Sequence, residues 1–147
     1  MAYQFKLEAL RKYRQHQEDD LQKKLAEAQR ELETALDKLS AQLARRERTE
    51  EDLHQCQQES TPGQHLAVYL HFLQKLSREI EQQQEVVAGL HKACDQARED
   101  VLEAMKKRKA LDKLKEKGWK QYMENLDHEE EKFINEMAIN RYNHKHR

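Results

Sequence analysis

Two short stretches of the sequence carry side chains that could bind a metal. The segment HEEEK, residues 128–132, begins like the helical motif of zinc proteases, but it places Lys132 where that motif needs its second histidine. His91 and Cys94 are spaced to share one helix face, yet they offer two ligands where a structural zinc site normally needs four. We therefore expect no metal and no cofactor, with Cys94 packed inside the fold and His91 exposed to water.

The composition argues against an enzyme and favours long helices. The chain has 147 residues, of which 37% are charged, and only three glycines and one proline, so it cannot bury a globular core of ordinary size. The glycines are isolated, so none of them belongs to a phosphate-binding loop. Good helix formers dominate. A rod of helices has no concave pocket, and we expect a protein that is not an enzyme.

Charge and apolar content restrict the partners and the location. Lys and Arg number 27 against 28 Asp and Glu, so the net charge of -1 gives no general attraction to nucleic acid or to a membrane surface. No stretch approaches the roughly 20 apolar residues of a membrane span, and the opening MAYQFKLEAL does not resemble a secretory signal. We expect a cytosolic protein whose two cysteines stay reduced.

A single break divides the chain into two helices. The segment QQESTPGQHL, residues 57–66, holds the only proline and one of the glycines. Thr61 can act as an N-cap, with Pro62 at the first helical position and Gln64 completing a capping box. The sequence therefore predicts one domain made of a first helix over about residues 3–58, a turn over about 59–63 and a second helix over about 64–140.

The apolar spacing predicts how each helix packs. In the first helix, leucines recur every 11 residues at Leu10, Leu21, Leu32 and Leu43, which predicts a nearly straight helix or a slight right-handed coil. The second helix follows a heptad pattern from Leu66 to Leu111, interrupted only by the polar residues Gln83 and Arg108. A short turn between two such helices predicts an all-α fold, an antiparallel coiled-coil hairpin.

The hairpin geometry leaves the end of the second helix without a partner. With the turn near residue 62, the chain start lies opposite about residue 123, so the final two dozen residues overhang. The same register separates Cys56 from Cys94 by tens of ångströms at about 1.5 Å per residue, which excludes a disulfide between them.

Three surfaces could contact other proteins. Near the turn, Leu70 and Phe72 widen the apolar stripe beyond the seam residues, either as a thicker local core or as a partner contact. At the open end, basic residues from both helices converge, either as a solvated face or as a surface for an acidic partner. The overhang carries aromatic and aliphatic residues that suit a binding surface or a dimer contact.

The two ends of the chain resemble the FliJ family, the small cytosolic component of the bacterial flagellar type III export apparatus. The resemblance covers nearly the whole length, and it is carried by MAYQFKLEALRKYRQHQEDDLQKKLAEAQRELE at the start and HEEEKFINEMAINRYNH at the end. The most telling positions are Phe5, Leu7, Leu10, Glu136, Ala138, Arg141 and Tyr142.

The resemblance implies a coiled coil similar to the central stalk of rotary ATPases, held at the inner membrane by the export apparatus. It implies binding to the hexameric export ATPase FliI at the open end and to the export gate protein FlhA at the hairpin tip, with export chaperones and FliH as further partners. The residues assigned to the ATPase are Phe5, Leu7, Leu10, Phe133, Ile134, Met137, Arg141 and Tyr142, those of the basic collar are Lys106, Lys107, Arg108, Lys109, Lys113 and Lys115, and those assigned to the gate are Tyr69, Leu70, Phe72 and Leu76.

Two other classes of function remain open at this stage. A homodimeric coiled-coil adaptor would pair the overhangs of two copies. A nucleic-acid-binding protein would use the basic residues to contact phosphates, but Glu18, Asp19 and Asp20 lie close to them in the hairpin, so we expect no nucleic-acid partner.

Overall fold

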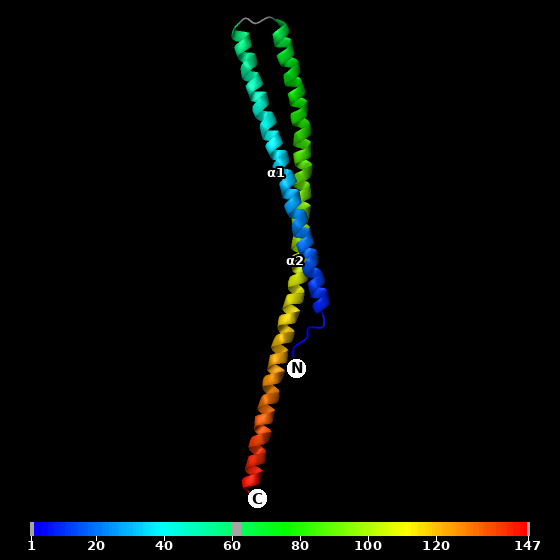
Figure 1. Cartoon of the computed structure of the whole chain (residues 1–147), viewed down its shortest axis with the longest axis vertical. Coiled ribbons are helices and arrows are strands. Elements are labelled where there is room, and N and C mark those ends of the chain that lie inside the picture. The colour runs from blue at the N-terminus through cyan, green and yellow to red at the C-terminus, as the bar shows by residue number, and fades with distance from the viewer. Residues whose placement is uncertain (1, 60–62, 147) are drawn as a thin grey trace. The chain divides into compact units, whose positions relative to one another are not determined.

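The computed structural model describes residues 2–59 and 63–146, and this part of the chain forms two helices. Helix α1 spans Glu8–Gln58 and helix α2 spans Gly63–Lys145 (Figure 1). The expected capping residues Thr61 and Pro62 lie outside the described residues. The few helix-breaking residues of the sequence explain why both helices run for so long without interruption.

The chain forms two compact units, each made of one stretch of α1 and one stretch of α2. The first unit joins the chain up to Asp19 with the chain from Glu103 onward, and the second runs from Asp20 to Leu102. The helices contact each other in reverse chain order, through Glu8 with Lys115 and Glu18 with Arg108 in the first unit, and Ala35 with Gln83 and Arg45 with Phe72 in the second. The predicted all-α hairpin of two long antiparallel helices is confirmed.

Helix α2 turns its seam toward α1 in both units. Every position of the predicted heptad pattern from Leu66 to Leu111 is buried or half-buried, and Leu76, Ile80 and Cys94 are the most completely buried side chains. His91, by contrast, is exposed. The expected placement of Cys94 inside the fold is therefore confirmed, and Cys56 is half-buried.

The two polar residues within this seam are each satisfied by α1. The amide of Gln83 donates a hydrogen bond of 3.0 Å to the backbone oxygen of Ala35, and the small Ala35 side chain leaves room for it. The guanidinium of Arg108 pairs with the carboxylate of Glu18. Because a buried polar group without a partner is costly, these pairings explain why the heptad continues through both positions.

The 11-residue spacing expected for α1 holds only for Leu21 and Leu32, which are half-buried, and is wrong for Leu10 and Leu43, which are exposed. From Ala28 onward, the buried and half-buried positions of α1 alternate instead in steps of four and three. A helix that packs along a heptad seam must present the same period, because each of its layers faces one layer of the partner. In α1 this seam consists of Leu21, Leu25, Ala28, Leu32, Ala35, Leu39, Gln42, Arg46, Thr49, Leu53 and Cys56.

Both helix boundaries at the open end differ from those expected. Helix α1 begins at Glu8 rather than near residue 3, and residues 2–7 form no helix. The Glu8 backbone N–H donates to the Phe5 carbonyl at 3.1 Å, which closes a tight turn ahead of the helix. Helix α2 runs to Lys145 rather than to about residue 140. Its last turn contains the basic residues His144 and Lys145, and a basic side chain there interacts favourably with the negative end of the helix dipole.

Candidate partner-binding surfaces

The end of α2 has no neighbouring helix in its unit. All residues from 127 to 146 are exposed, and Figure 1 shows this stretch of α2, orange to red, continuing past the start of α1. The exposed fractions of Phe133 and Ile134 are 62% and 63%, and that of Met137 is 43%. Residues 126–146 are called the overhang below, and the expected exposure of the apolar residues from Phe133 onward is confirmed.

The apolar residues of the overhang concentrate on one helix face. At about 100° per residue, Leu126, Phe133 and Met137 fall within a narrow sector, and Ile134 flanks them. The same sector contains Trp119 and Tyr122, further back along α2. This row of residues 126, 133, 134 and 137 is called the stripe, and it continues the seam of the hairpin past the start of α1.

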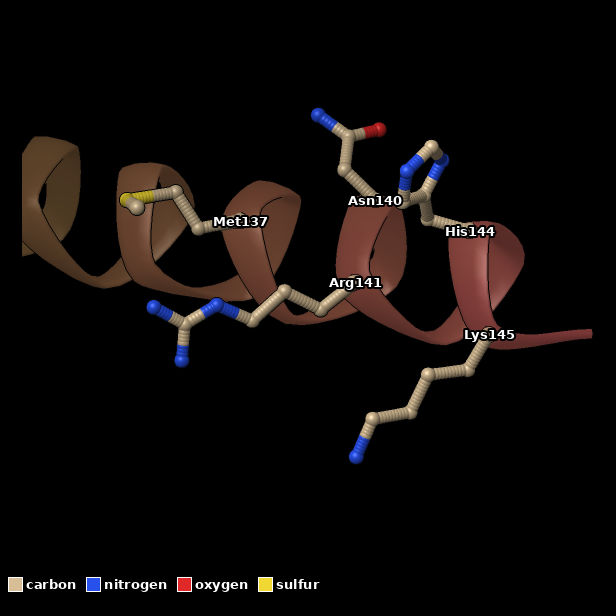
Figure 2. Close-up of a pocket in the computed structure, with 5 residues that line it drawn as sticks. All are labelled: Met137, Asn140, Arg141, His144 and Lys145. Atoms are coloured by element: carbon tan, nitrogen blue, oxygen red, sulfur yellow. The ribbon is translucent and has the colours of Figure 1, made fainter.

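The stripe carries two shallow hollows. One is lined by Leu126, Glu129, Glu130, Phe133 and Ile134, and the other by Met137, Asn140, Arg141, His144 and Lys145. Figure 2 shows the second hollow, with Met137 between a row formed by Asn140 and His144 and a row formed by Arg141 and Lys145. The hollows differ in charge, because carboxylates border the first and cationic side chains border the second.

Two of the expected apolar residues lie away from the stripe. Ile139 is 58% exposed and Tyr142 is 63% exposed, and both fall on the side of the helix opposite the stripe. The Tyr142 ring stacks on the His146 ring with centroids 4.2 Å apart. The helix geometry therefore separates Tyr142 from Phe133, Ile134 and Met137, with which the sequence analysis grouped it.

The residues before α1 pack against α2 through an aromatic cluster. The Tyr3 ring lies 5.7 Å from both the Trp119 and the Tyr122 ring, and its hydroxyl donates to the Lys115 carbonyl at 3.2 Å. The ring occupies space beside Gly118, where a Cβ atom would collide with the Tyr3 hydroxyl. This contact holds the non-helical residues before α1 against α2.

A matched pair of glycine variants tests this contact. Gly89 lies mid-helix with open space where a Cβ atom would stand, so Gly89→Ala should stabilise the hairpin by about 1 kcal/mol through helix propensity. Gly118→Ala gains the same propensity but displaces the Tyr3 ring, so most of that gain should be lost. Thermal unfolding compares the two variants, and only Gly118→Ala should change the Trp119 fluorescence. Equal stabilisation with unchanged fluorescence would contradict the contact.

The predicted basic collar contains two kinds of cation. Lys106, Lys107, Lys109 and Lys113 are exposed. Arg108 instead turns into the seam, where it pairs with Glu18 and, at 2.7 Å, with Asp112. Lys115 is half-buried and lies 3.1 Å from Glu8. Four of the six collar residues therefore present charge to solvent, and the other two hold the helices together.

Glu8 is the acidic centre of a small ion-pair network at the start of α1. The carboxylate accepts hydrogen bonds from Arg11, the shortest at 2.7 Å, and contacts Lys115 from α2. The hydrogen bond from Arg11 and then that from Lys115 lower the pKa of Glu8 to about 2. Because the folded pKa lies below the ordinary value, the stabilising contribution of Glu8 is present above about pH 4.5 and is lost as the pH falls toward 2.

The residues assigned to the hairpin tip divide between core and surface. Leu76 is 2% exposed and belongs to the core, and the half-buried Phe72 ring is covered by the Arg45 guanidinium, 5.0 Å from its centroid. A hydrogen bond with Cys56 raises the pKa of the half-buried Tyr69. Leu70 is exposed. Of the four predicted residues, only Leu70 presents most of its apolar surface to solvent.

Two exposed apolar residues next to these surfaces were missed from the sequence. Val68 precedes Leu70 by two residues, on the other side of α2, and is 69% exposed, and Met123 lies beside the stripe. Both fall between the seam positions of the heptad. A search for apolar residues outside the seam, rather than for those that extend it, would have identified them.

The described residues contain neither a membrane-spanning helix nor a cluster of metal ligands. No helix between residues 2 and 146 is long and apolar enough to cross a membrane. Within the same part of the chain, no group of three or more His, Cys, Asp or Glu side chains is arranged to hold a metal ion.

The fold and its exposed stripe define a class of protein: an antiparallel coiled-coil hairpin in which the end of one helix has an exposed apolar face. The family model described as "Flagellar FliJ protein" matches residues 3–147. The chain therefore belongs to the FliJ family and is a component of the flagellar protein export apparatus, which serves flagellum biogenesis. The family is one of structural export components rather than of known enzymes. Neither a curated protein nor a solved structure matches the chain.

Proposed function

We propose that this protein acts as the stalk-like subunit of the export apparatus and that the hexameric export ATPase FliI binds its overhang. The supporting observation is the stripe, since Phe133, Ile134 and Met137 are exposed on a helix that no other part of the described chain covers. Burying an apolar side chain of this size stabilises a complex by about 2 kcal/mol. A partner that encloses the helix gains this stabilisation from each apolar side chain of the stripe that it buries.

Charge near the stripe suits the same partner. The exposed lysines Lys106, Lys107, Lys109 and Lys113 project from the part of α2 that precedes the overhang in the chain. Such a cluster attracts an acidic surface and speeds association, and the attraction weakens as salt is added. In this proposal the lysines guide the ring onto the helix, and the stripe then provides the affinity.

Binding of this kind would promote assembly and activity of the ring. A helix that several ATPase subunits contact at once raises their effective concentration for one another. Phe5, Leu7 and Leu10 of the N-terminal part, together with Arg141 of the overhang, are proposed as further contacts, whereas Tyr142 lies on the side of α2 away from the stripe. The protein would then lie in the cytoplasm, at the inner membrane through the export apparatus, with FliH and export chaperones as additional partners.

The experiment that tests this proposal compares the full chain with a deletion that ends at residue 125. ATP hydrolysis by the purified export ATPase is measured alone and with each protein. We expect stimulation by the full chain and none by the deletion, because the deletion removes the stripe while leaving the packed part of both helices intact. Equal stimulation by both would refute the assignment of the overhang.

The second proposed partner is the export gate protein FlhA, which would bind near the turn through Leu70. We expect Leu70→Asp to weaken gate binding about tenfold or more, because a charge would replace a buried apolar contact. Val86→Asp is the matched control, since Val86 is another exposed apolar residue of α2. Calorimetric titration with the gate protein measures both variants, and equal weakening by both would contradict a specific site at Leu70.

A further inference from the structure

Two blocks of opposite charge lie along the end of α2, an acidic block around the first part of the stripe and a basic block beyond Met137. The acidic block contains Glu124, Asp127, Glu129, Glu130 and Glu131, and the basic block contains Arg141 and Lys145 with His144 and His146. All of these side chains are exposed. No ion pair between the two blocks is present in the described chain, and along a straight helix they lie too far apart to reach each other.

We infer that the overhang binds the overhang of a second copy of this chain in antiparallel orientation. The seam positions 126, 130, 133, 137, 140 and 144 follow the heptad spacing. In the antiparallel arrangement, Phe133 of one copy lies over Met137 of the other, and Leu126 lies over His144. The acidic block of each copy then faces the basic block of the other. The dimer therefore contains two contacts between blocks of opposite charge.

The two hollows of the stripe suit this arrangement. The hollow beside Phe133 is bordered by Glu129 and Glu130, and the hollow beside Met137 is bordered by Arg141 and Lys145. Antiparallel pairing places each acidic hollow over a basic one, whereas parallel pairing places like charges over one another. Charge complementarity therefore selects the antiparallel dimer.

Two flanking pairs determine the orientation most sharply. In the antiparallel coiled coil Asp127 of one copy faces Arg141 of the other, and this pair occurs twice. Glu136 faces its own equivalent near the twofold axis. In a parallel coiled coil Glu136 would instead face Arg141 of the partner. Removing the charge of Glu136 therefore strengthens the antiparallel dimer and weakens a parallel one.

The dimer has a functional consequence that does not depend on which other protein binds the overhang. Any partner that covers the stripe must first separate the two copies, so self-association and partner binding compete. The dimer keeps the exposed apolar residues covered while the protein is free. The inference itself concerns the protein alone and holds whether or not the export ATPase proves to be the partner.

Sedimentation equilibrium of the isolated full chain tests the inference over micromolar to near-millimolar concentrations. We expect the mass to rise toward twice that of one chain, and the deletion that ends at residue 125 to remain monomeric. Arg141→Asp and Asp127→Arg, each measured alone, should raise the dissociation constant about tenfold, because two attractions become two repulsions. An equal mixture of the two variants should associate as tightly as the unmodified chain, since both pairs are restored.

Each other outcome would overturn the inference. A chain that stays monomeric at every concentration excludes the dimer, and a deletion that still dimerises moves the contact away from the overhang. Failure of the mixed variants to associate, or weaker association of Glu136→Gln, excludes the antiparallel orientation. Circular dichroism of each variant establishes that the helices are intact. The ATP hydrolysis measurement is independent, so failure of one proposal leaves the other standing.

Discussion

Arg108→Leu is expected to lower the free energy of unfolding by about 3 kcal/mol. Glu18 is 4% exposed, and the described contacts of its carboxylate are those with Arg108. The guanidinium also reaches Asp112, and the hydrogen bond with Glu18 is the main cause that raises the pKa of Arg108. Removing the cation leaves the Glu18 carboxylate in a closely packed seam with no positive partner. An unpaired buried charge lowers the stability of the fold by more than the intact ion pair raises it.

The double variant Glu18→Leu with Arg108→Leu should recover this loss or exceed it. It replaces the pair by two apolar residues at positions where the heptad expects them, which is often neutral or stabilising. Urea unfolding followed by circular dichroism measures all three proteins. Lys109→Leu serves as the control, because Lys109 is the exposed neighbour of Arg108. A double variant as unstable as Arg108→Leu alone would show that the pair has a further structural role.

Replacing both Phe133 and Met137 by aspartate is expected to abolish stimulation of the export ATPase while leaving the helix content unchanged. Both side chains are exposed, so the substitutions remove no contact inside the described chain. In the proposed complex they would bury two carboxylates in an apolar contact, which costs several kcal/mol. That cost is enough to lower the affinity by a factor of about a thousand.

The control for this variant lies on the other side of the same helix. Ile139 is exposed to a similar extent as Phe133, but it falls away from the stripe. Ile139→Asp should therefore stimulate ATP hydrolysis as the unmodified chain does. Concentration series of all three proteins distinguish weaker binding from lower maximal stimulation. If Ile139→Asp proves as damaging, the partner surrounds the helix or the overhang unfolds, and the assignment of one face is wrong.

The fold was predictable from the sequence because its main signals are local. One break near Pro62 and a heptad from Leu66 to Leu111 are sufficient to predict a hairpin of two helices. The overhang follows from the lengths of the two helices alone. The exposed stripe was predictable for the same reason, since Phe133 and Met137 lie beyond any residue that could cover them.

The remaining features depend on contacts between residues far apart in the chain. The seam of α1 includes Gln42, Arg46 and Thr49, so a search for leucines alone found an 11-residue period instead of the true heptad. Thr49 is accommodated because its hydroxyl donates to the Arg45 carbonyl at 2.8 Å. Arg108 and Lys115 looked like members of an exposed cluster until their partners Glu18 and Glu8 were located on α1.

The length of the overhang limits which partners can use it. The residues from 127 to 145 rise about 28 Å along the axis of α2, close to the diameter of a small globular domain. An isolated helix of this length is only marginally stable in water, but this one extends a helix that is already formed and so avoids the cost of nucleation. A partner therefore binds a helix that is already formed, and little conformational entropy of this chain is lost on binding. To cover the whole length of the overhang, the partner needs a channel or groove about 28 Å long.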